Sequence, residues 1–136
     1  MFLTICYISN ASEKLTDQDI ETLLLDAKVF NNQNNISGIL IYSDFTFFQV
    51  IEGEYNIIKS LFERIEQDYR HYNILKILEI KSEKKEYHKY NTNFITHNKK
   101  KANQELLKVI ENNQHIFSQK LHNFIVYQSK SLMSIY

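Results

Sequence analysis

Two hydrophobic spacings alternate along residues 1–80, and this alternation restricts the possible folds more than any other feature of the chain. Short runs rich in β-branched and aromatic residues predict strands, whereas apolar residues at positions i, i+3, i+4 and i+7 predict helices packed by one face. The resulting order, β-α-β-β-α-β, is typical of the ferredoxin-like α+β fold, in which two helices cover one face of a four-stranded sheet. Strands are expected at 2–8, 38–42, 45–51 and 74–80, and helices at 16–30 and 57–69.

Local signals predict where these elements begin and end. Thr16, followed three residues later by Asp19, predicts a capping box at the start of the first helix, and the asparagine-rich run 31–35 predicts its end. Ser43-Asp44 predicts a tight hairpin between the second and third strands. The apolar pairs in the strand at 74–80 predict that it is buried on both faces.

The last third of the chain differs in composition from the rest. A charged connection follows the fourth strand, after which the apolar spacing predicts an edge strand and two helices. Those helices have apolar faces and must pack on the sheet or on a partner subunit. We therefore divide the chain into a domain at 1–96, with its fifth strand at 90–96, and a C-terminal helical extension at 97–136, with helices at 102–113 and 115–129.

Charge and composition exclude several classes of protein. The 136 residues suit one domain, and sixteen basic side chains balance sixteen acidic ones, which disfavours a nucleic-acid binder. Acidic residues are in excess at 1–72 and basic ones at 73–136. This asymmetry indicates solvated faces of opposite sign, and the alternatives are that the two halves pair with each other or head to tail with a copy of the chain. The first apolar run is too short for a membrane span. The single cysteine, Cys6, is expected to be an inert core thiol, and the protein to be cytoplasmic.

The sequence lacks the motifs of common enzymes. It has no glycine-rich phosphate loop, and its five histidines lack the spacing of metal ligands, so neither catalysis nor a metal site is expected. RNA-binding modules of this topology stack bases on aromatic residues of the third strand, where this chain has Phe45, Phe47 and Phe48. Because no basic residues flank them, core packing is the better interpretation of these rings.

Two polar residues stand where apolar ones belong. Alternation places Tyr7 on one face with Leu3 and Ile5, and Gln49 lies inside an otherwise apolar run. A buried glutamine without a hydrogen-bond partner costs on the order of 1–3 kcal/mol. The Gln49 amide is therefore satisfied by the Tyr7 hydroxyl, by a water or by a ligand. A core glutamine satisfied by protein is the alternative to a ligand site.

Four segments, in order and without gaps, resemble the BLUF (blue light using flavin) family. The resemblance extends from the N-terminus to Phe94, and the rest of the chain matches no family pattern. The segments are Tyr7-Ile-Ser-Asn-Ala-Ser12, Asn31 with Ile36-Ser-Gly-Ile-Leu-Ile-Tyr42, Phe48-Gln-Val-Ile-Glu-Gly53 and Arg64-Ile-Glu-Gln-Asp-Tyr-Arg-His71.

The resemblance implies that a flavin is held between the two helices. FAD is expected, with FMN or riboflavin as alternatives, because no dinucleotide motif fixes the phosphate end. By position, Tyr7 matches the family's electron donor, and Gln49 matches the glutamine between that tyrosine and the flavin. The other cofactor-binding positions are Asn31 at the carbonyl and ring-nitrogen edge, Arg64 and Asp68 near the other edge, and Leu23 and Ile65 on the two faces of the ring.

The light reaction implied by the resemblance explains these residue types. A light-excited flavin is a strong oxidant, to which Tyr7 can give an electron and then a proton. The Gln49 amide has an acceptor at one end and two donors at the other, so turning or tautomerising it changes the group that faces the flavin carbonyl and gives a metastable, red-shifted state. Two positions depart from the family, since Tyr90 replaces the usual tryptophan and Thr92 the usual methionine. They leave the lifetime of that state and the relay into the fifth strand open.

The predicted function is blue-light photoreception without catalysis. The signal would pass through the fifth strand and the C-terminal helices to a separate signalling protein. A homo-oligomer is expected, whereas nucleic-acid and membrane partners are not. The alternative is a light-inert flavin-binding or protein-interaction module of the same fold.

Overall fold

The computed structural model describes residues 1–84, 93–96 and 104, and it confirms the predicted β-α-β-β-α-β order. The elements are β1 (Phe2–Ala11), α1 (Asp17–Gln33), β2 (Ser37–Ser43), β3 (Thr46–Glu54), α2 (Tyr55–Gln67), β4 (His71–Ser82) and β5 (Asn93–Thr96).

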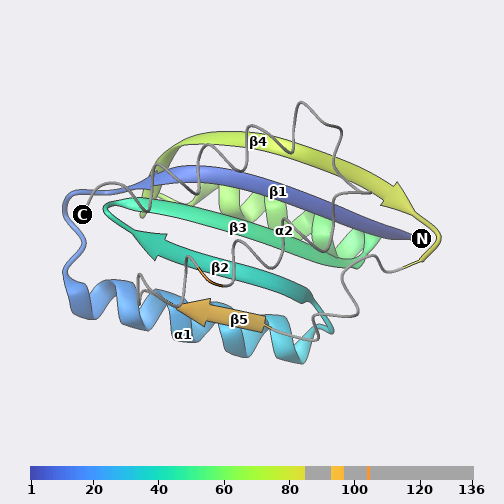
Figure 1. The fold of residues 1–136 in the computed structure, drawn as a ribbon, viewed down its shortest axis with the longest axis horizontal. Helices are drawn as coiled ribbons and strands as arrows, with labels where there is room; N and C mark the ends of the chain where they lie inside the picture. Colours follow the sequence, from blue (N-terminus) through green and yellow to red (C-terminus); the bar gives the residue numbers. More distant parts are fainter. Residues whose placement is uncertain (85–92, 97–103, 105–136) are drawn as a thin grey trace.

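The strands form one sheet in the order β4-β1-β3-β2-β5 (Figure 1). The first four strands pair antiparallel, whereas β5 pairs parallel to β2 at the edge. The predicted fifth strand is therefore confirmed, although in the described residues it covers only 93–96 of the expected 90–96. The predicted helices at 102–113 and 115–129 lie outside the described residues.

Both helices pack on the same face of the sheet. Alternation turns the odd-numbered residues of β1 toward this face, and two buried clusters divide it. The first cluster lies under α2 and the second under α1. The α2 cluster includes Leu3, Ile5, Ile51, Ile58 and Phe62, and the α1 cluster includes Ala11, Ile20, Leu24, Leu40 and Phe47.

The start of α1 follows the sequence prediction, but its end does not. The Asp19 N–H donates to Thr16 Oγ1 at 3.1 Å and the Thr16 N–H donates to Asp19 Oδ2 at 2.9 Å, which confirms the capping box. The helix runs to Gln33 instead of ending at the start of the asparagine run, and the chain leaves it through Asn35, whose φ is 54°. The last helical turn thus contains Asn31.

Two predictions about burial were wrong. The hairpin turn lies at Asp44-Phe45, one residue later than expected, and Phe45 has a φ of 60°. The Phe45 side chain is 57% exposed, so of the three aromatic rings only Phe47 and Phe48 pack in the core. In β4, Leu75 is 53% exposed. The reason is that β4 neighbours only β1 in the described sheet and pairs with it through two register shifts.

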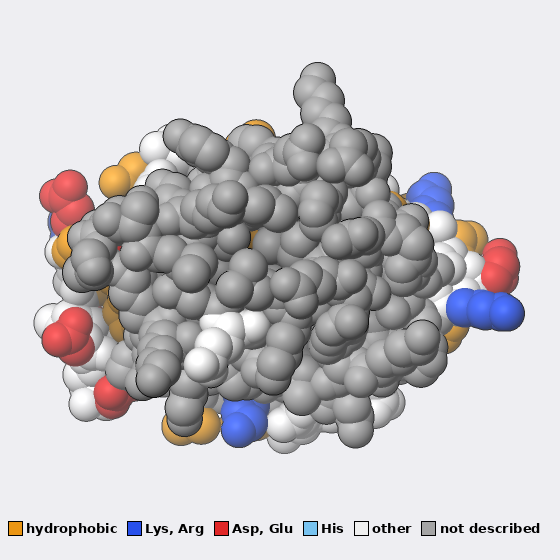
Figure 2. All heavy atoms as spheres, viewed as in Figure 1, with side chains coloured by type: hydrophobic (Ala, Val, Ile, Leu, Met, Phe, Trp, Pro, Cys, Tyr) orange, Lys and Arg blue, Asp and Glu red, His pale blue; other side chains and the backbone are white. Residues whose placement is uncertain are grey.

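Charged side chains of the described residues lie around the periphery in the view of Figure 2. Acidic ones predominate at the left end of that view, where β1 ends and α1 begins, and both signs occur at the right end. This matches the acidic excess of residues 1–72. None of the helices in the described part of the chain has the length and apolar character needed to span a membrane.

Candidate functional site

Tyr7 and Gln49 face each other across the two central strands. The antiparallel register of β1 and β3 pairs them directly, and both side chains are buried, with 4% and 5% exposure. The Tyr7 hydroxyl donates a hydrogen bond to Gln49 Oε1. Of the three partners that the sequence left open for the Gln49 amide, the structure thus provides the hydroxyl.

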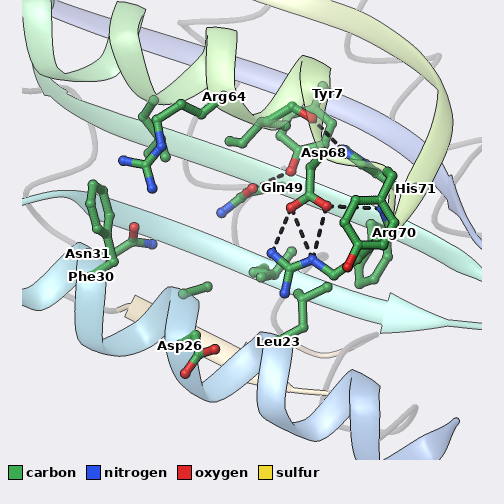
Figure 3. Close-up of a pocket in the computed structure, with 16 residues that line it drawn as sticks. Tyr7, Leu23, Asp26, Phe30, Asn31, Gln49, Arg64, Asp68, Arg70 and His71 are labelled. Carbon is green, nitrogen blue, oxygen red and sulfur yellow. Dashed lines mark hydrogen bonds and ion pairs between the residues drawn. The ribbon is translucent and has the colours of Figure 1, made fainter. Parts of the chain in front are cut away.

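This bond fixes the orientation of the Gln49 amide. Because its oxygen accepts from Tyr7, its nitrogen points away from the phenol and toward the space between the helices (Figure 3). Within the described residues, no protein acceptor binds that nitrogen, so its two N–H groups remain available. Burial raises the pKa of the Tyr7 phenol, and the Asp68 carboxylate raises it further. The phenol is therefore neutral across the physiological pH range.

A cavity of about 610 Å³ lies between α1 and α2, above the Tyr7–Gln49 pair. This volume falls within the usual range of small-molecule pockets, roughly 300–1,000 Å³. Seven predicted site residues line it together: Tyr7, Leu23, Asn31, Gln49, Arg64, Ile65 and Asp68. The other two, Tyr90 and Thr92, lie outside the described residues.

Asn31 is placed at the cavity by the extra turn of α1. Its backbone carbonyl accepts hydrogen bonds from the N–H groups of Asn34, at 3.3 Å, and Ile36, at 2.9 Å, which fix the end of the helix. Its side chain is buried at 5% exposure and lines the cavity. No hydrogen-bonding partner for that carboxamide occurs among the described residues, so it can offer a donor and an acceptor to a bound molecule.

Arg64 spans the cavity from α2 toward α1. Its guanidinium carbon lies 5.0 Å from the centre of the Phe30 ring, a cation–π contact between the two helices. A planar guanidinium stacked in this way keeps its N–H groups free to donate to carbonyl or phosphate oxygens.

Asp68 forms an ion pair with Arg70 at the other side of the cavity. Arg70 Nε lies 3.0 and 3.1 Å from the two carboxylate oxygens, and Nη2 lies 2.6 Å from Oδ2. The hydrogen bond from Arg70 is the main reason that the pKa of Asp68 is lowered. The Asp68 carboxylate of this pair lies between the Arg70 guanidinium and the Tyr7–Gln49 pair (Figure 3).

His71 connects three elements at the same side of the cavity. Its Nε2 lies 2.5 Å from the Ile65 carbonyl at the end of α2, and its Nδ1 lies 2.7 Å from Ser9 Oγ on β1. A carbonyl can only accept, so Nε2 carries the proton, and in the neutral ring Nδ1 accepts from the serine hydroxyl. Its ring also contacts the rings of Tyr7 and Phe47, each at 6.2 Å between centres.

The site roles of Phe30, Arg70 and His71 were missed from the sequence. Arg70 and His71 stand at the end of a segment that resembles the family, but neither was assigned a role. Helical spacing could not predict the positions of Arg70 and His71, because α2 ends at Gln67 and the chain then turns back into β4. In the described residues, no three His, Cys, Asp or Glu side chains are grouped so that they could hold a metal ion.

The donor set of the cavity fits a flavin ring. The polar edge of that ring alternates carbonyl oxygens with ring nitrogens, and the cavity offers the Asn31 carboxamide, the Gln49 N–H groups and the Arg64 guanidinium. The two large faces of a flavin ring are apolar, and the apolar side chains Leu23 and Ile65 line the cavity from opposite helices.

Comparisons with known proteins agree with this geometry. The family model named BLUF and described as sensors of blue-light using FAD matches residues 2–93. The chain is 35% identical over 78 residues to the blue light- and temperature-regulated antirepressor BluF of Escherichia coli (strain K12), which covers 57% of this chain and 19% of that protein. It is 33% identical over 85 residues to the photoactivated adenylate cyclase subunit alpha-like protein FB of Euglena gracilis, covering 62% of this chain and 8% of that one. The chain thus spans less than a fifth of the length of these relatives.

Solved structures resemble the chain over more of its length. The ground state of BlsA superposes with a TM-score of 0.66 at 29% identity, covering 94% of this chain and 87% of that one. Its photo-activated state gives 0.65 at 29% identity and covers 94% of both chains. Klebsiella pneumoniae BlrP1 with FMN and cyclic diGMP gives 0.61 at 30% identity, covering 71% of this chain and 26% of that one.

Proposed function

The chain belongs to the BLUF family of flavin-binding blue-light sensors, and on this premise we propose that it senses light by moving an electron and a proton from Tyr7 and rearranging the hydrogen bonds of Gln49. The observation that carries the proposal is the buried bond from the Tyr7 hydroxyl to Gln49 Oε1 at the wall of the cavity. That bond leaves the amide nitrogen directed at the place where a flavin would lie (Figure 3).

The residues that would hold the ring come from both helices and the sheet. Asn31 and Gln49 would bind its carbonyl and ring-nitrogen edge, Arg64 and Asp68 would lie near its other edge, and Leu23 and Ile65 would cover its faces. When excited by blue light, a bound flavin supplies an acceptor for one electron. FAD is our preferred flavin, and FMN and riboflavin present the same ring to these residues.

The chain's own groups are arranged for coupled electron and proton transfer. Tyr7 is neutral and buried, so it would give up an electron first and its proton afterwards, without passing through a charged phenolate. Its proton already lies in a hydrogen bond to the Gln49 carbonyl oxygen. Transfer of the Tyr7 proton to that oxygen, with release of an amide N–H proton to the acceptor that has taken the electron, would convert the amide into its tautomer, and rotation would then exchange the donor and acceptor ends.

The described strands suggest a route from Gln49 toward the C-terminal part of the chain. Gln49 pairs with Leu40 of β2, and Leu40 pairs with Ile95 of β5, so the three residues lie in one register row (Figure 1). A change at Gln49 can therefore alter the ladder that ends at β5. We propose that this edge and the predicted extension at 97–136 pass the signal to a separate protein, with the sensor acting as a homo-oligomer in the cytoplasm.

An absorption spectrum of the purified full chain tests the function. Blue light should shift the flavin bands to the red, and the shift should reverse in the dark. In Gln49→Leu the flavin should stay bound, because the side-chain volume is nearly kept, but the shift should be lost. Flavin binding without a shift in the wild type would favour the light-inert module, and failure to bind any flavin would refute both functions.

A further inference from the structure

We propose that Asp68 is a positioning residue for the light reaction: its negative charge, held beside Tyr7 and partly balanced by Arg70, sets how readily the phenol gives up its electron. The inference rests on the proposed function, because the electron goes to the light-excited flavin. One electron would leave the phenol for the excited flavin, and its proton would follow through the Gln49 amide to the same acceptor. Both would return to Tyr7 once the Gln49 amide has rearranged, and the rearranged hydrogen bonds would revert in the dark.

The carboxylate of Asp68 is held in place from several directions. Asp68 is the C-cap of α2, and its backbone N–H donates to the Ile65 carbonyl at 3.2 Å. The backbone N–H of Arg70 donates to Oδ1 at 3.0 Å, and the guanidinium binds both oxygens. The charge therefore lies in a fixed place between the Tyr7–Gln49 pair and the Arg70 guanidinium (Figure 3).

The Asp68 charge acts on a buried phenol, although the carboxylate itself is partly exposed and water screens it in part. Because Tyr7 is buried, the charge is screened less at its phenol than it would be at an exposed side chain. A negative charge disfavours the phenolate, and the Asp68 carboxylate raises the pKa of Tyr7 in this way. The same charge favours loss of an electron, because the oxidised phenol carries one more positive charge. Arg70 binds both oxygens of the carboxylate, so its positive charge offsets part of the Asp68 charge.

The two members of the ion pair should therefore have opposite effects when they are neutralised. Asp68→Asn keeps the shape of the side chain and an acceptor for Arg70 but removes the negative charge. Arg70→Gln leaves that charge unbalanced. Glu66→Gln is the matched control, because it removes a negative charge two residues from Asp68, on an exposed side chain that does not line the cavity.

The first measurement reports the electrostatic effect of both charges on the phenol at position 7. A fluorinated tyrosine, whose phenol is more acidic than that of tyrosine, is placed at position 7 of the full chain, and its pKa is titrated by fluorine NMR in the dark. We expect Asp68→Asn to lower this pKa by about one pH unit, because the carboxylate is partly exposed and water screens it. Arg70→Gln should raise the pKa by a smaller amount, because Arg70 is the more exposed of the two and acts by offsetting the Asp68 charge. Glu66→Gln should leave it within about 0.2 units.

The second measurement is the rate at which flavin-loaded protein forms the red-shifted state, followed by transient absorption. It should fall several-fold in Asp68→Asn and rise in Arg70→Gln. The inference is overturned if Asp68→Asn moves the pKa no more than the control does, or if both variants move it in the same direction. A wild type that binds flavin but gives no red shift would refute the proposed function, whereas the titration would still decide the effect of Asp68 on Tyr7.

Discussion

The hydrogen bond between Tyr7 and Gln49 should be measurable as a coupling between their contributions to stability. Tyr7→Phe removes the donor and leaves the buried Gln49 carbonyl oxygen without it. An unsatisfied buried polar group costs about 1–3 kcal/mol, so we expect the free energy of unfolding to fall by about 2 kcal/mol. Gln49→Leu leaves the buried hydroxyl unpaired and should cost somewhat less, because leucine adds apolar burial.

The double variant should cost less than the sum of the two single ones. With both polar groups gone, neither is left unpaired, and we expect a coupling energy of about 1–2 kcal/mol. Urea denaturation followed by circular dichroism gives the four free energies, provided that all four proteins are compared at the same flavin occupancy. Tyr72→Phe is the control, because this side chain is 48% exposed and its loss should change stability by less than about 0.5 kcal/mol.

Simple additivity would contradict the reasoning. If the cost of the double variant equals the sum within about 0.5 kcal/mol, the hydroxyl and the amide do not interact in solution. The orientation assigned to the Gln49 nitrogen would then lose its basis, since it follows from the oxygen being held by Tyr7.

Two further predictions concern the frame of the site. A Cβ at Gly38, whose φ is 154°, would lie 1.9 Å from the Val50 carbonyl oxygen, so Gly38→Ala should destabilise the protein by about 3 kcal/mol or more in thermal unfolding. The control is Gly53→Ala, whose Cβ would meet a flexible side chain at 3.3 Å and which should cost about 1 kcal/mol. Equal losses of stability in the two variants would contradict the argument. Because Arg70 lowers the pKa of Asp68, this group's contribution to stability is complete above its ordinary pKa of about 3.9 and is lost as the pH falls through the lowered value. Stability should therefore fall more steeply below about pH 4 in the wild type than in Asp68→Asn, and parallel acid profiles would refute this.

The sequence predicted the sheet side of the site well because a strand has a period of two. Alternation alone places Tyr7 and Gln49 on the helix-covered face, and the structure pairs them directly. The helical neighbours Leu23 and Ile65 were also predictable, since they belong to apolar stripes whose faces are set by the 3.6-residue period, whereas Arg64 was assigned only by the family resemblance.

The ends of the helices were harder to predict. Asparagine is a weak helix former, so the run 31–35 indicated a break, yet tertiary packing keeps Asn31 in the last turn of α1. Arg70 lies in the connection between α2 and β4, and His71 is the first residue of β4, so no helical or strand period predicts where their side chains point. Their positions depend on hydrogen bonds to Asp68 and Ile65 that only the fold brings together.

The distribution of buried polar side chains connects the fold to its function. Five such residues occur in the described part of the chain, and two of them, Thr4 and Glu52, share a hydrogen bond of 2.7 Å on the opposite face of the sheet. The other three, Ser9, Asn31 and Gln49, bear on the cavity, either lining it or binding His71 at its wall. An apolar residue at each of these three positions would give a more stable core. Polar residues kept at buried positions at the expense of stability are typical of functional sites. Of these five residues, only Asn31 and Gln49 have a side-chain group without a partner among the described residues, namely the Asn31 carboxamide and the Gln49 nitrogen. Both can be satisfied by one planar molecule with alternating acceptors and donors.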